Sequence, residues 1–374
     1  MAKKRTRRVG WSSSSSSSRR SEAFKHSSHN SVKSHTNRHH WLTTFCILFF
    51  IISLLIYLQR HYYTATTDLD GDKPYVYQRG LVKIDPTYLE VLNENTKVSE
   101  NISRRHFRNP VLAYITPWNS KGYDLAKKFS SKITHLSPVW YELKNEGSKL
   151  VLHGRHNADR GWISDIRMKG NALALQFIKQ LGKAMHSVHL ERNGKTNLQL
   201  VYVVGPPRTD KLQEHDFGAE DLQALYDAVD GFSLMTYDHS SPYNPGPNAP
   251  LKWIRSTLRL LVGAGSKCRR LAEKIFVGIN FYGNDFVMSG GLGGGPIIAH
   301  EYLSLLEKHK PVFQWEENSA EHFLLYSDNQ DVKHAVFYPS LMSLALRLEE
   351  ALSWGAGISI WEIGQGLEYF LDIL

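Results

Sequence analysis

The sequence is poor in cysteine, because only Cys46 and Cys268 occur among its 374 residues. Cys46 lies inside a long apolar run, so the remainder of the chain has a single cysteine and no disulfide can form within it. The same shortage excludes metal sites built from cysteine clusters. A core of this size must therefore be held by apolar packing, for which 42% hydrophobic residues are sufficient. We expect neither a metal nor a cofactor.

A phosphate-binding glycine motif is also missing. The glycine-rich run at residues 289–296 matches neither the G-x-G-x-x-G spacing of dinucleotide-binding loops nor the P-loop spacing. We interpret this run as a loop.

Positive charge is confined to one end of the chain. The formal net charge is +9, but residues 1–40 alone contain ten Lys and Arg against one acid, Glu22, and the rest of the chain is balanced. A near-neutral folded part argues against a basic groove, so we expect no nucleic-acid partner. The Ser-, Arg- and His-rich composition of residues 1–40 predicts a disordered cytosolic tail.

Residues 41–58 form an apolar run without a charged residue. As a helix they would span about 27 Å, close to the hydrocarbon thickness of a bilayer. A cleaved signal peptide fits less well, because forty residues precede the run and no small-residue cleavage site follows it. A core helix would carry a more polar face. We therefore predict a single-pass membrane protein with a cytosolic N-terminus and a lumenal or extracellular C-terminal domain, in the endoplasmic reticulum, the Golgi or a later secretory compartment.

Residues 59–108 are mixed and polar and predict a lumenal stem with one short helix at the sequence TYLEVL. A glycosylation sequon, Asn-Ile-Ser, begins at Asn101 and fits such a stem.

From residue 109 onward, short apolar runs alternate with amphipathic stretches, which is typical of βαβ units and a parallel sheet. Such units can close into an eight-stranded barrel or remain an open, doubly wound sheet. The strands that we predict are residues 111–116, 133–139, 198–204, 231–236, 275–282 and 357–362.

Aromatic and acidic residues gather at or just after the C-terminal ends of these strands. In a barrel those ends meet on one face, where sites are built. Each residue alone fits ordinary packing, but several together favour a carbohydrate cleft, because aromatic rings stack on sugars and carboxylates bind their hydroxyls and amides. The candidates at these ends are Trp118, Trp140, Tyr141, Glu142, Tyr237, Asp238, Tyr282, Trp361 and Glu362.

Several motifs are similar to those of glycoside hydrolase family 18, the chitinases and chitinase-like proteins. FSLMTYD, KIFVGINFYG and GAGISIWEIGQG resemble the family's sixth, seventh and eighth strands, and HAVFYPSLMSLALRLEEA resembles the segment that leads from the insertion into the last helix. The resemblance covers residues 108–374. It implies a (β/α)8 TIM barrel with a small insertion between strands seven and eight, and an oligosaccharide containing N-acetylglucosamine as the partner.

The resemblance also implies roles for single residues. Tyr237 and Asp238 match the pair that contacts the substrate's acetamido group, Trp361 matches the floor of the sugar pocket, and Tyr114 matches a first-strand aromatic. In the family, a glutamate after the fourth strand protonates the glycosidic oxygen while that acetamido group attacks the anomeric carbon.

The fourth-strand motif D-x-x-D-x-D-x-E is absent from the chain. Only 58 residues separate Val139 from Leu198, where a full barrel needs about 80 for its third and fourth strands and their helices. The strand-like run at residues 149–154 predicts a hairpin or an edge strand instead. We therefore expect about six of eight core strands, with a deletion near residues 170–174 that a skipped exon, an alternative transcript, an incomplete gene model or evolutionary loss would explain.

Three functions stay open. The favoured one is a carbohydrate-binding protein without hydrolysis, in which the substrate contacts are Tyr114, Trp118, Trp140, Tyr237, Asp238, Tyr282, Trp361 and Glu362 and no residue is catalytic. The second is a glycosidase with Glu142 or Glu362 as the acid. The third is a non-functional variant. A receptor-type protein partner also stays open.

Overall fold

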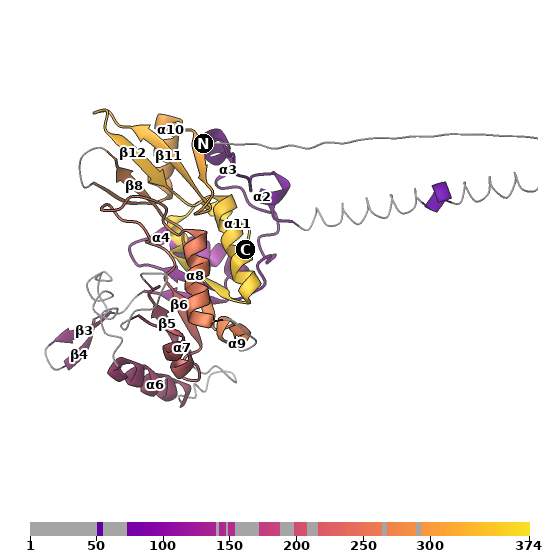
Figure 1. The fold of residues 1–374 in the computed structure, drawn as a ribbon. Helices are drawn as coiled ribbons and strands as arrows, with labels where there is room; N and C mark the ends of the chain where they lie inside the picture. The colour runs from indigo at the N-terminus through magenta and orange to yellow at the C-terminus, as the bar shows by residue number, and fades with distance from the viewer. Residues whose placement is uncertain are drawn as a thin grey trace, which may run out of the picture. The chain divides into compact units, whose positions relative to one another are not determined.

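The computed structural model describes residues 51–54, 73–139, 142–146, 149–153, 172–187, 198–207, 216–263, 268–288 and 293–374. The chain divides into two compact units, Met1–Asp68 and Leu69–Leu374. The fold described below is that of the second unit (Figure 1).

The main sheet has six parallel strands in the order β2-β1-β13-β7-β6-β5. The first strand pairs with the last, with Ala113 opposite Ile360, which is how a (β/α)8 barrel closes. Among the described residues, β2 and β5 are left as edges, and the sheet is a curled half-barrel. This confirms the predicted incomplete barrel with six strands: β1 (Val111–Ile115), β2 (His135–Pro138), β5 (Val201–Val204), β6 (Gly231–Leu234), β7 (Ile275–Asn280) and β13 (Gly357–Trp361).

The interior of the half-barrel is filled by side chains from facing strands. Phe276 of β7 projects inward and is 6% exposed. A Cβ atom at Gly231 would lie 2.5 Å from its ring, and one at Gly357 would lie 3.0 Å from it. The two neighbouring strands therefore need glycine where they meet this phenylalanine. One layer further on, Ser233 donates a hydrogen bond to Ser359 across the interior at 3.0 Å.

Helices cover the outside of the sheet (Figure 1). α8 buries Ile254, Leu258 and Leu261 at helical spacing. α11 begins at the Ser340 cap and ends at Gly355, whose positive φ of 77° suits glycine. The helices of this layer are α4 (Ser120–Lys128), α6 (Ala172–Ser187), α7 (Ala219–Leu225), α8 (Leu251–Val262), α9 (Cys268–Ala272) and α11 (Leu341–Trp354), with 3-10 turns η1 (Ser130–Lys132), η2 (Ile363–Gln365) and η3 (Glu368–Leu371).

The chain between β7 and β13 forms the expected insertion. It is an antiparallel sheet in the order β10-β11-β12-β8-β9, accompanied by α10 (Ala299–His309). Its strands are β8 (Gly283–Val287), β9 (Gly294–Ile297), β10 (Phe313–Glu316), β11 (Glu321–Ser327) and β12 (Lys333–Phe337). The interpretation of residues 289–296 as a loop is thus wrong for the last three of them, because they pair with β8.

The strand-like run at residues 149–154 is a hairpin, as one of the two alternatives predicted. β4 (Lys149–His153) pairs antiparallel with β3 (Glu142–Glu146), and the two form a sheet of their own.

Residues 73–108 belong to the same compact unit as the half-barrel. The Asp372 carboxylate accepts hydrogen bonds from the backbone N–H groups of Val76 at 3.0 Å and Ser99 at 2.7 Å, which ties this segment to the end of the chain. The short helix predicted here is α3 (Tyr88–Glu94), capped by Thr87, and it follows α2 (Tyr75–Gln78). Asn101 is exposed; its glycosylation stays a prediction.

Among the described residues, none of the helices combines the length and the apolar character that a bilayer crossing requires. This finding contradicts the predicted localisation, which we correct accordingly. The described part of the predicted anchor is a helical stretch at residues 51–54. The rest of that anchor and the predicted tail lie outside the described residues.

Candidate functional site

Two aromatic side chains meet where β1 and β13 end. The ring centroids of Tyr114 and Trp361 are 5.4 Å apart, with the planes tilted by 54°. Tyr114 also packs with Leu112 and Phe276 inside the half-barrel. Burial raises the pKa of the Tyr114 hydroxyl, so it remains a neutral hydrogen-bonding group. Trp361 is only partly buried and offers an aromatic face at the strand ends.

A second aromatic pair follows β6 and β7. Tyr237 and Tyr282 meet edge to face with centroids 6.3 Å apart. Gly278 of β7 makes this approach possible, because a Cβ atom there would lie 2.9 Å from the Tyr237 ring and 2.2 Å from the Leu234 carbonyl oxygen. Strand ends and one glycine thus position both rings.

Asp238 presents its carboxylate beside this pair. It is exposed, its φ of 59° lies in the left-handed region, and its Oδ1 accepts a hydrogen bond from the Tyr282 hydroxyl. Burial, reinforced by the Asp238 charge, holds the pKa of Tyr282 well above its ordinary value of 10. Tyr282 is therefore a permanent donor at neutral pH and orients the Asp238 carboxylate.

Glu362 is placed differently from the other candidates. It is fully buried, its Oε1 accepts a hydrogen bond from the Asn119 side chain, and its Oε2 accepts one from the Gly364 N–H at 3.3 Å. Burial raises its pKa to about 7, against the opposing effects of these donors and of Lys121. The carboxyl group thus joins β13 to the start of α4 and does not extend beside the rings.

The remaining candidates are not brought into this group. Trp118 lies in the turn after β1 and is 52% exposed. Trp140 and Tyr141 lie outside the described residues, as does the side chain of Glu142. The structure therefore gathers Tyr114 with Trp361, and Tyr237 and Asp238 with Tyr282.

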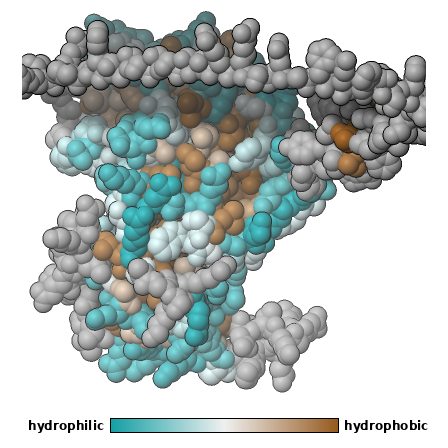
Figure 2. Space-filling view, turned by 45° about the vertical axis from the view of Figure 1, so that its right-hand side comes forward, coloured by the Kyte–Doolittle hydropathy of each residue, from teal (hydrophilic) through white to brown (hydrophobic). Residues whose placement is uncertain are grey.

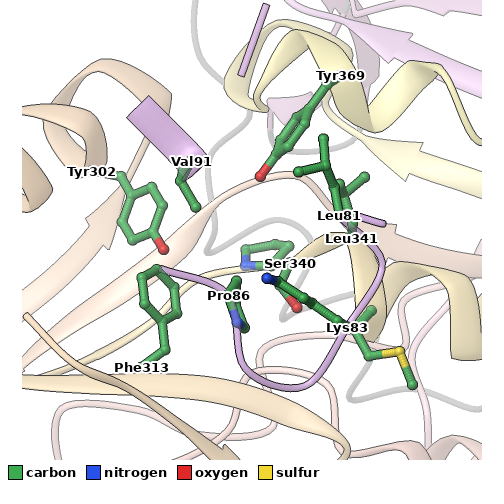
Figure 3. Close-up of a pocket in the computed structure, with 11 residues that line it drawn as sticks. Leu81, Lys83, Pro86, Val91, Tyr302, Phe313, Ser340, Leu341 and Tyr369 are labelled. Atoms are coloured by element: carbon green, nitrogen blue, oxygen red, sulfur yellow. The ribbon is translucent and has the colours of Figure 1, made fainter. Parts of the chain in front are cut away.

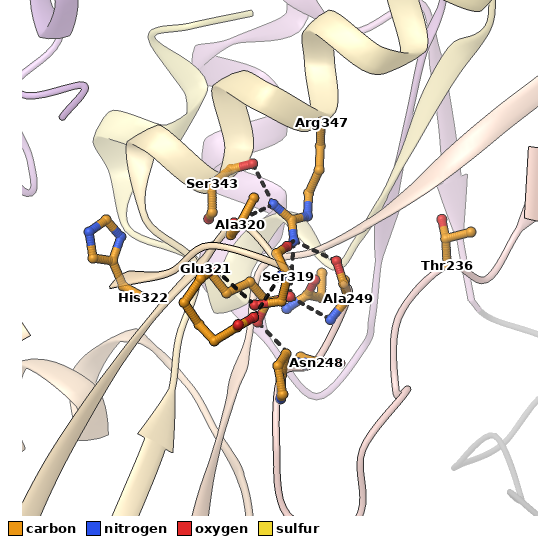
Figure 4. A network of polar contacts seen from close by, with 12 residues as sticks. Thr236, Asn248, Ala249, Ser319, Ala320, Glu321, His322, Ser343 and Arg347 are labelled. Carbon is orange, nitrogen blue, oxygen red and sulfur yellow. Dashed lines mark hydrogen bonds and ion pairs between the residues drawn. The ribbon is translucent and has the colours of Figure 1, made fainter. Parts of the chain in front are cut away.

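Sequence reasoning missed a polar group behind Asp238. Asn248 accepts a hydrogen bond from the Asp238 N–H at 2.6 Å, and its own backbone N–H donates to the buried carboxylate of Glu321 at 3.0 Å. Arg347 completes this network (Figure 4). The proline-rich run around Asn248 carries no motif for such a role, and its contacts come from residues far along the chain.

Other sites are less prominent in the described part of the chain. No group of three or more His, Cys, Asp or Glu residues there could hold a metal ion. A small pocket lies where residues 81–91 cross α10, β10 and α11, lined among others by Lys83, Tyr302, Phe313 and Tyr369 (Figure 3). None of the sugar-contact candidates lines this pocket.

The strand ends therefore offer ring faces and one exposed carboxylate. Of the candidate carboxylates whose side chains the structure describes, Asp238 is exposed and Glu362 is buried. Such a set binds flat apolar faces together with hydroxyl and amide groups.

The family model for glycosyl hydrolases family 18 matches residues 95–366, which includes all six barrel strands and the insertion. The chain belongs to this family. Its membership agrees with the half-barrel, the pairing of first and last strands, and the insertion before β13.

Similar proteins include the cortical fragment-lytic enzyme of Bacillus subtilis, which is 22% identical over 196 residues, or 50% of this chain and 42% of that protein. The chain spans less than half the length of the curated relatives it matches.

Solved structures show the same fold. A chitinase from Chromobacterium violaceum superposes with a TM-score of 0.56 at 18% identity, covering 71% of this chain and 98% of that one. The spore cortex-lytic enzyme SleL of Bacillus megaterium superposes with a TM-score of 0.54 at 15% identity, covering 73% and 74%.

Proposed function

We propose that the protein is a chitinase-like carbohydrate-binding protein that holds oligosaccharides containing N-acetylglucosamine without cleaving them. The observation that carries the proposal is the convergence of Tyr114 with Trp361, and of Tyr237 with Asp238 and Tyr282, at the carboxyl ends of four adjacent strands. Stacking on Trp361 would hold the sugar ring, and Asp238 would accept a hydrogen bond from the acetamido N–H.

Binding without hydrolysis is supported by the carboxylates. Glycoside hydrolysis needs an acid that protonates the leaving oxygen, and the D-x-x-D-x-D-x-E motif that supplies it in the family is absent from the sequence. Glu362 has the raised pKa expected of an acid, but its carboxyl group is enclosed by Asn119 and Gly364. It supports Trp361 in this proposal and does not donate a proton to a sugar.

The finer resemblance is part of the proposal. VLAYITPWN, HLSPVWYEL, DGFSLMTYD and PGPNAPLKW are similar to motifs of the chitinase domain-containing proteins within the family. A longer form that restores strands three and four would be the glycosidase alternative, which the names of the relatives, chitinase and lytic enzyme, favour.

Titration calorimetry with a chitooligosaccharide, alongside an assay with a chromogenic chitooligosaccharide, tests the proposal. We expect binding without turnover, and at least about a tenfold loss of affinity in Trp361→Ala, as for a central aromatic contact. Trp354→Ala is the matched control, because Trp354 bonds to Glu350 on the outer helix α11 and should leave affinity unchanged. Turnover that disappears in Glu142→Gln or Glu362→Gln would establish the enzyme instead, and absence of binding by a folded protein would refute the proposal.

A further inference from the structure

A buried ion pair joins the insertion to the barrel. Arg347 of α11 and Glu321 of β11 are 2% and 7% exposed, and their Nη2 and Oε1 atoms are 3.0 Å apart. The Arg347 guanidinium also donates to the carbonyl oxygens of Ser343 at 2.7 Å and Ala320 at 3.0 Å (Figure 4). A buried charge with this many partners is held in one position.

The Glu321 carboxylate, which Arg347 holds in place, also binds the loop before α8. Its Oε2 accepts the Asn248 N–H at 3.0 Å, and its Oε1 accepts the Ala249 N–H at 2.7 Å. Two adjacent backbone groups are therefore bound by one fixed carboxylate, which fixes the main chain at Asn248.

Asn248 in turn holds the two residues that follow Tyr237. Its side-chain Oδ1 accepts the Asp238 N–H at 2.6 Å, and its backbone carbonyl accepts the His239 N–H at 2.9 Å. The contact with an N–H fixes which end of the amide is oxygen. The Nδ2 atom of Asn248 is buried and has no partner within hydrogen-bond distance among the described residues. The Asn248 amide nevertheless partly offsets the effect of burial, which raises the pKa of the Tyr282 hydroxyl.

The contacts of Asn248 hold a residue whose backbone conformation is strained. Asp238 has a φ of 59°, a conformation that is uncommon outside glycine and that costs on the order of 1 kcal/mol or more. Relaxation to a negative φ would turn the Asp238 carboxylate away from the Tyr282 hydroxyl that it now binds. Asn248 accepts hydrogen bonds from the N–H groups of Asp238 and His239, one on each side of the Asp238 Cα, so it opposes this change of φ.

We propose that Asn248, anchored by the buried pair of Glu321 and Arg347, is a positioning residue that holds Asp238 in its left-handed conformation and so directs its carboxylate to the acetamido group of the ligand. The identity of the ligand rests on the proposed function, whereas the positioning of Asp238 by Asn248 rests on the geometry alone. It makes the insertion a support of the sugar site through β11.

The first test compares Asn248→Ala with Asn284→Ala. Asn284 is a matched control, since it is also a buried asparagine whose Nδ2 lacks a partner among the described residues, and its neighbours are β9 and β12. We expect Asn248→Ala to weaken chitooligosaccharide binding about three- to tenfold, the effect of one lost hydrogen bond. Asn284→Ala should stay within about twofold. Unchanged affinity in a folded Asn248→Ala protein would overturn the proposal.

A second readout needs no ligand. Hydrogen exchange of a peptide spanning residues 235–241 should accelerate in Asn248→Ala and stay unchanged in Asn284→Ala, because the first substitution removes Oδ1, the acceptor of the Asp238 N–H, while the backbone acceptor of the His239 N–H remains. If the wild type binds no glycan but this acceleration is seen, the proposed function fails and the positioning role stands. Equal exchange in the two variants would refute the positioning role.

A third variant covers failure of Asn248→Ala to fold. Asn248→Asp is isosteric and keeps the Oδ1 acceptor, so exchange of the same peptide should stay within about twofold of the wild type. Faster exchange in a folded Asn248→Asp protein would contradict the assigned role of Oδ1.

Discussion

The half-barrel has a closed side, formed by the inner strands β1, β13, β7 and β6, and an open side, formed by the edge strands β2 and β5. The two sides differ in burial, although both consist of parallel strands. Every residue of β1, β6 and β7 is buried, whereas the edge strands β2 and β5 leave Leu136 47% and Val203 43% exposed. Apolar side chains lie among polar ones on the face shown in Figure 2. An apolar parallel strand is thus buried only where other strands and helices pack against it, and its own sequence does not determine how exposed it will be.

The open side also leaves backbone groups without a strand partner. Among the described residues, β2 pairs only with β1, and β5 only with β6. These edges bury less apolar surface than the inner strands, so the open side should contribute little to stability. The sugar-contact candidates that the structure brings together, by contrast, lie on or after β1, β6, β7 and β13 of the closed side: Tyr114, Tyr237, Asp238, Tyr282 and Trp361.

The largest effect should come from the interior of the closed side. Phe276→Ala should reduce the free energy of unfolding by about 3 to 5 kcal/mol, because the glycines around the ring cannot fill the cavity. Urea denaturation measures the change. Val203→Ala on the open edge is the control and should cost less than about 1 kcal/mol; equal losses at the two positions would remove the distinction between the sides.

Glu362 predicts a pH dependence for the closed side. Its pKa of about 7 exceeds the ordinary 4.5, so between these values the folded state holds a proton that the unfolded state has lost. The stability that this proton contributes is full below pH 4.5 and is lost as the pH rises through 7, by at most about 3 kcal/mol.

Glu362→Gln removes this titration. Thermal melts from pH 4.5 to 8 should therefore fall less steeply with pH in the variant than in the wild type. Glu349→Gln, at an exposed position of the same helix α11, is the control for a general charge effect. Parallel profiles for wild type and Glu362→Gln would contradict the assignment.

Gly278→Ala should affect both the stability of the fold and sugar binding at the strand ends. The new Cβ would lie 2.2 Å from the Leu234 carbonyl oxygen and 2.9 Å from the Tyr237 ring, which predicts a loss of about 2 to 3 kcal/mol and weaker sugar binding. Denaturation and calorimetry measure the two effects. Gly295→Ala, where a Cβ meets nothing within 4 Å, should change neither; a neutral Gly278→Ala would show that the two tyrosine rings do not need this close approach.

The smallest expected effect lies on the open side. Leu136→Ser should change the free energy of unfolding by less than about 1 kcal/mol, since the side chain is already half exposed. It should reduce concentration-dependent association in light scattering, because apolar sheet edges pair with other chains. A loss comparable with that of Phe276→Ala would mean that β2 is covered in solution.

Much of the fold could be predicted because the signals are local. The apolar runs at residues 111–116 and 275–282 correspond to β1 and β7, and the short separation of Val139 from Leu198 predicts the missing strands. Strand-end positions also select Tyr237, Asp238 and Tyr282 as candidates, and the structure brings these three side chains together. The strand at Gly294–Ile297 was missed because glycine carries no β signal, and it forms only through pairing with β8.

The sequence by itself determined the six barrel strands, which of their ends carry aromatic rings, and that the fourth-strand acid motif is absent, because each follows from residue identity and spacing. Only the tertiary structure decided that Glu362 is enclosed at the start of α4 while Asp238 stays exposed. It alone also connected Arg347, Glu321 and Asn248 to Asp238. These outcomes depend on contacts between residues tens to hundreds of positions apart, and desolvation and hydrogen bonding there follow from the packed neighbours.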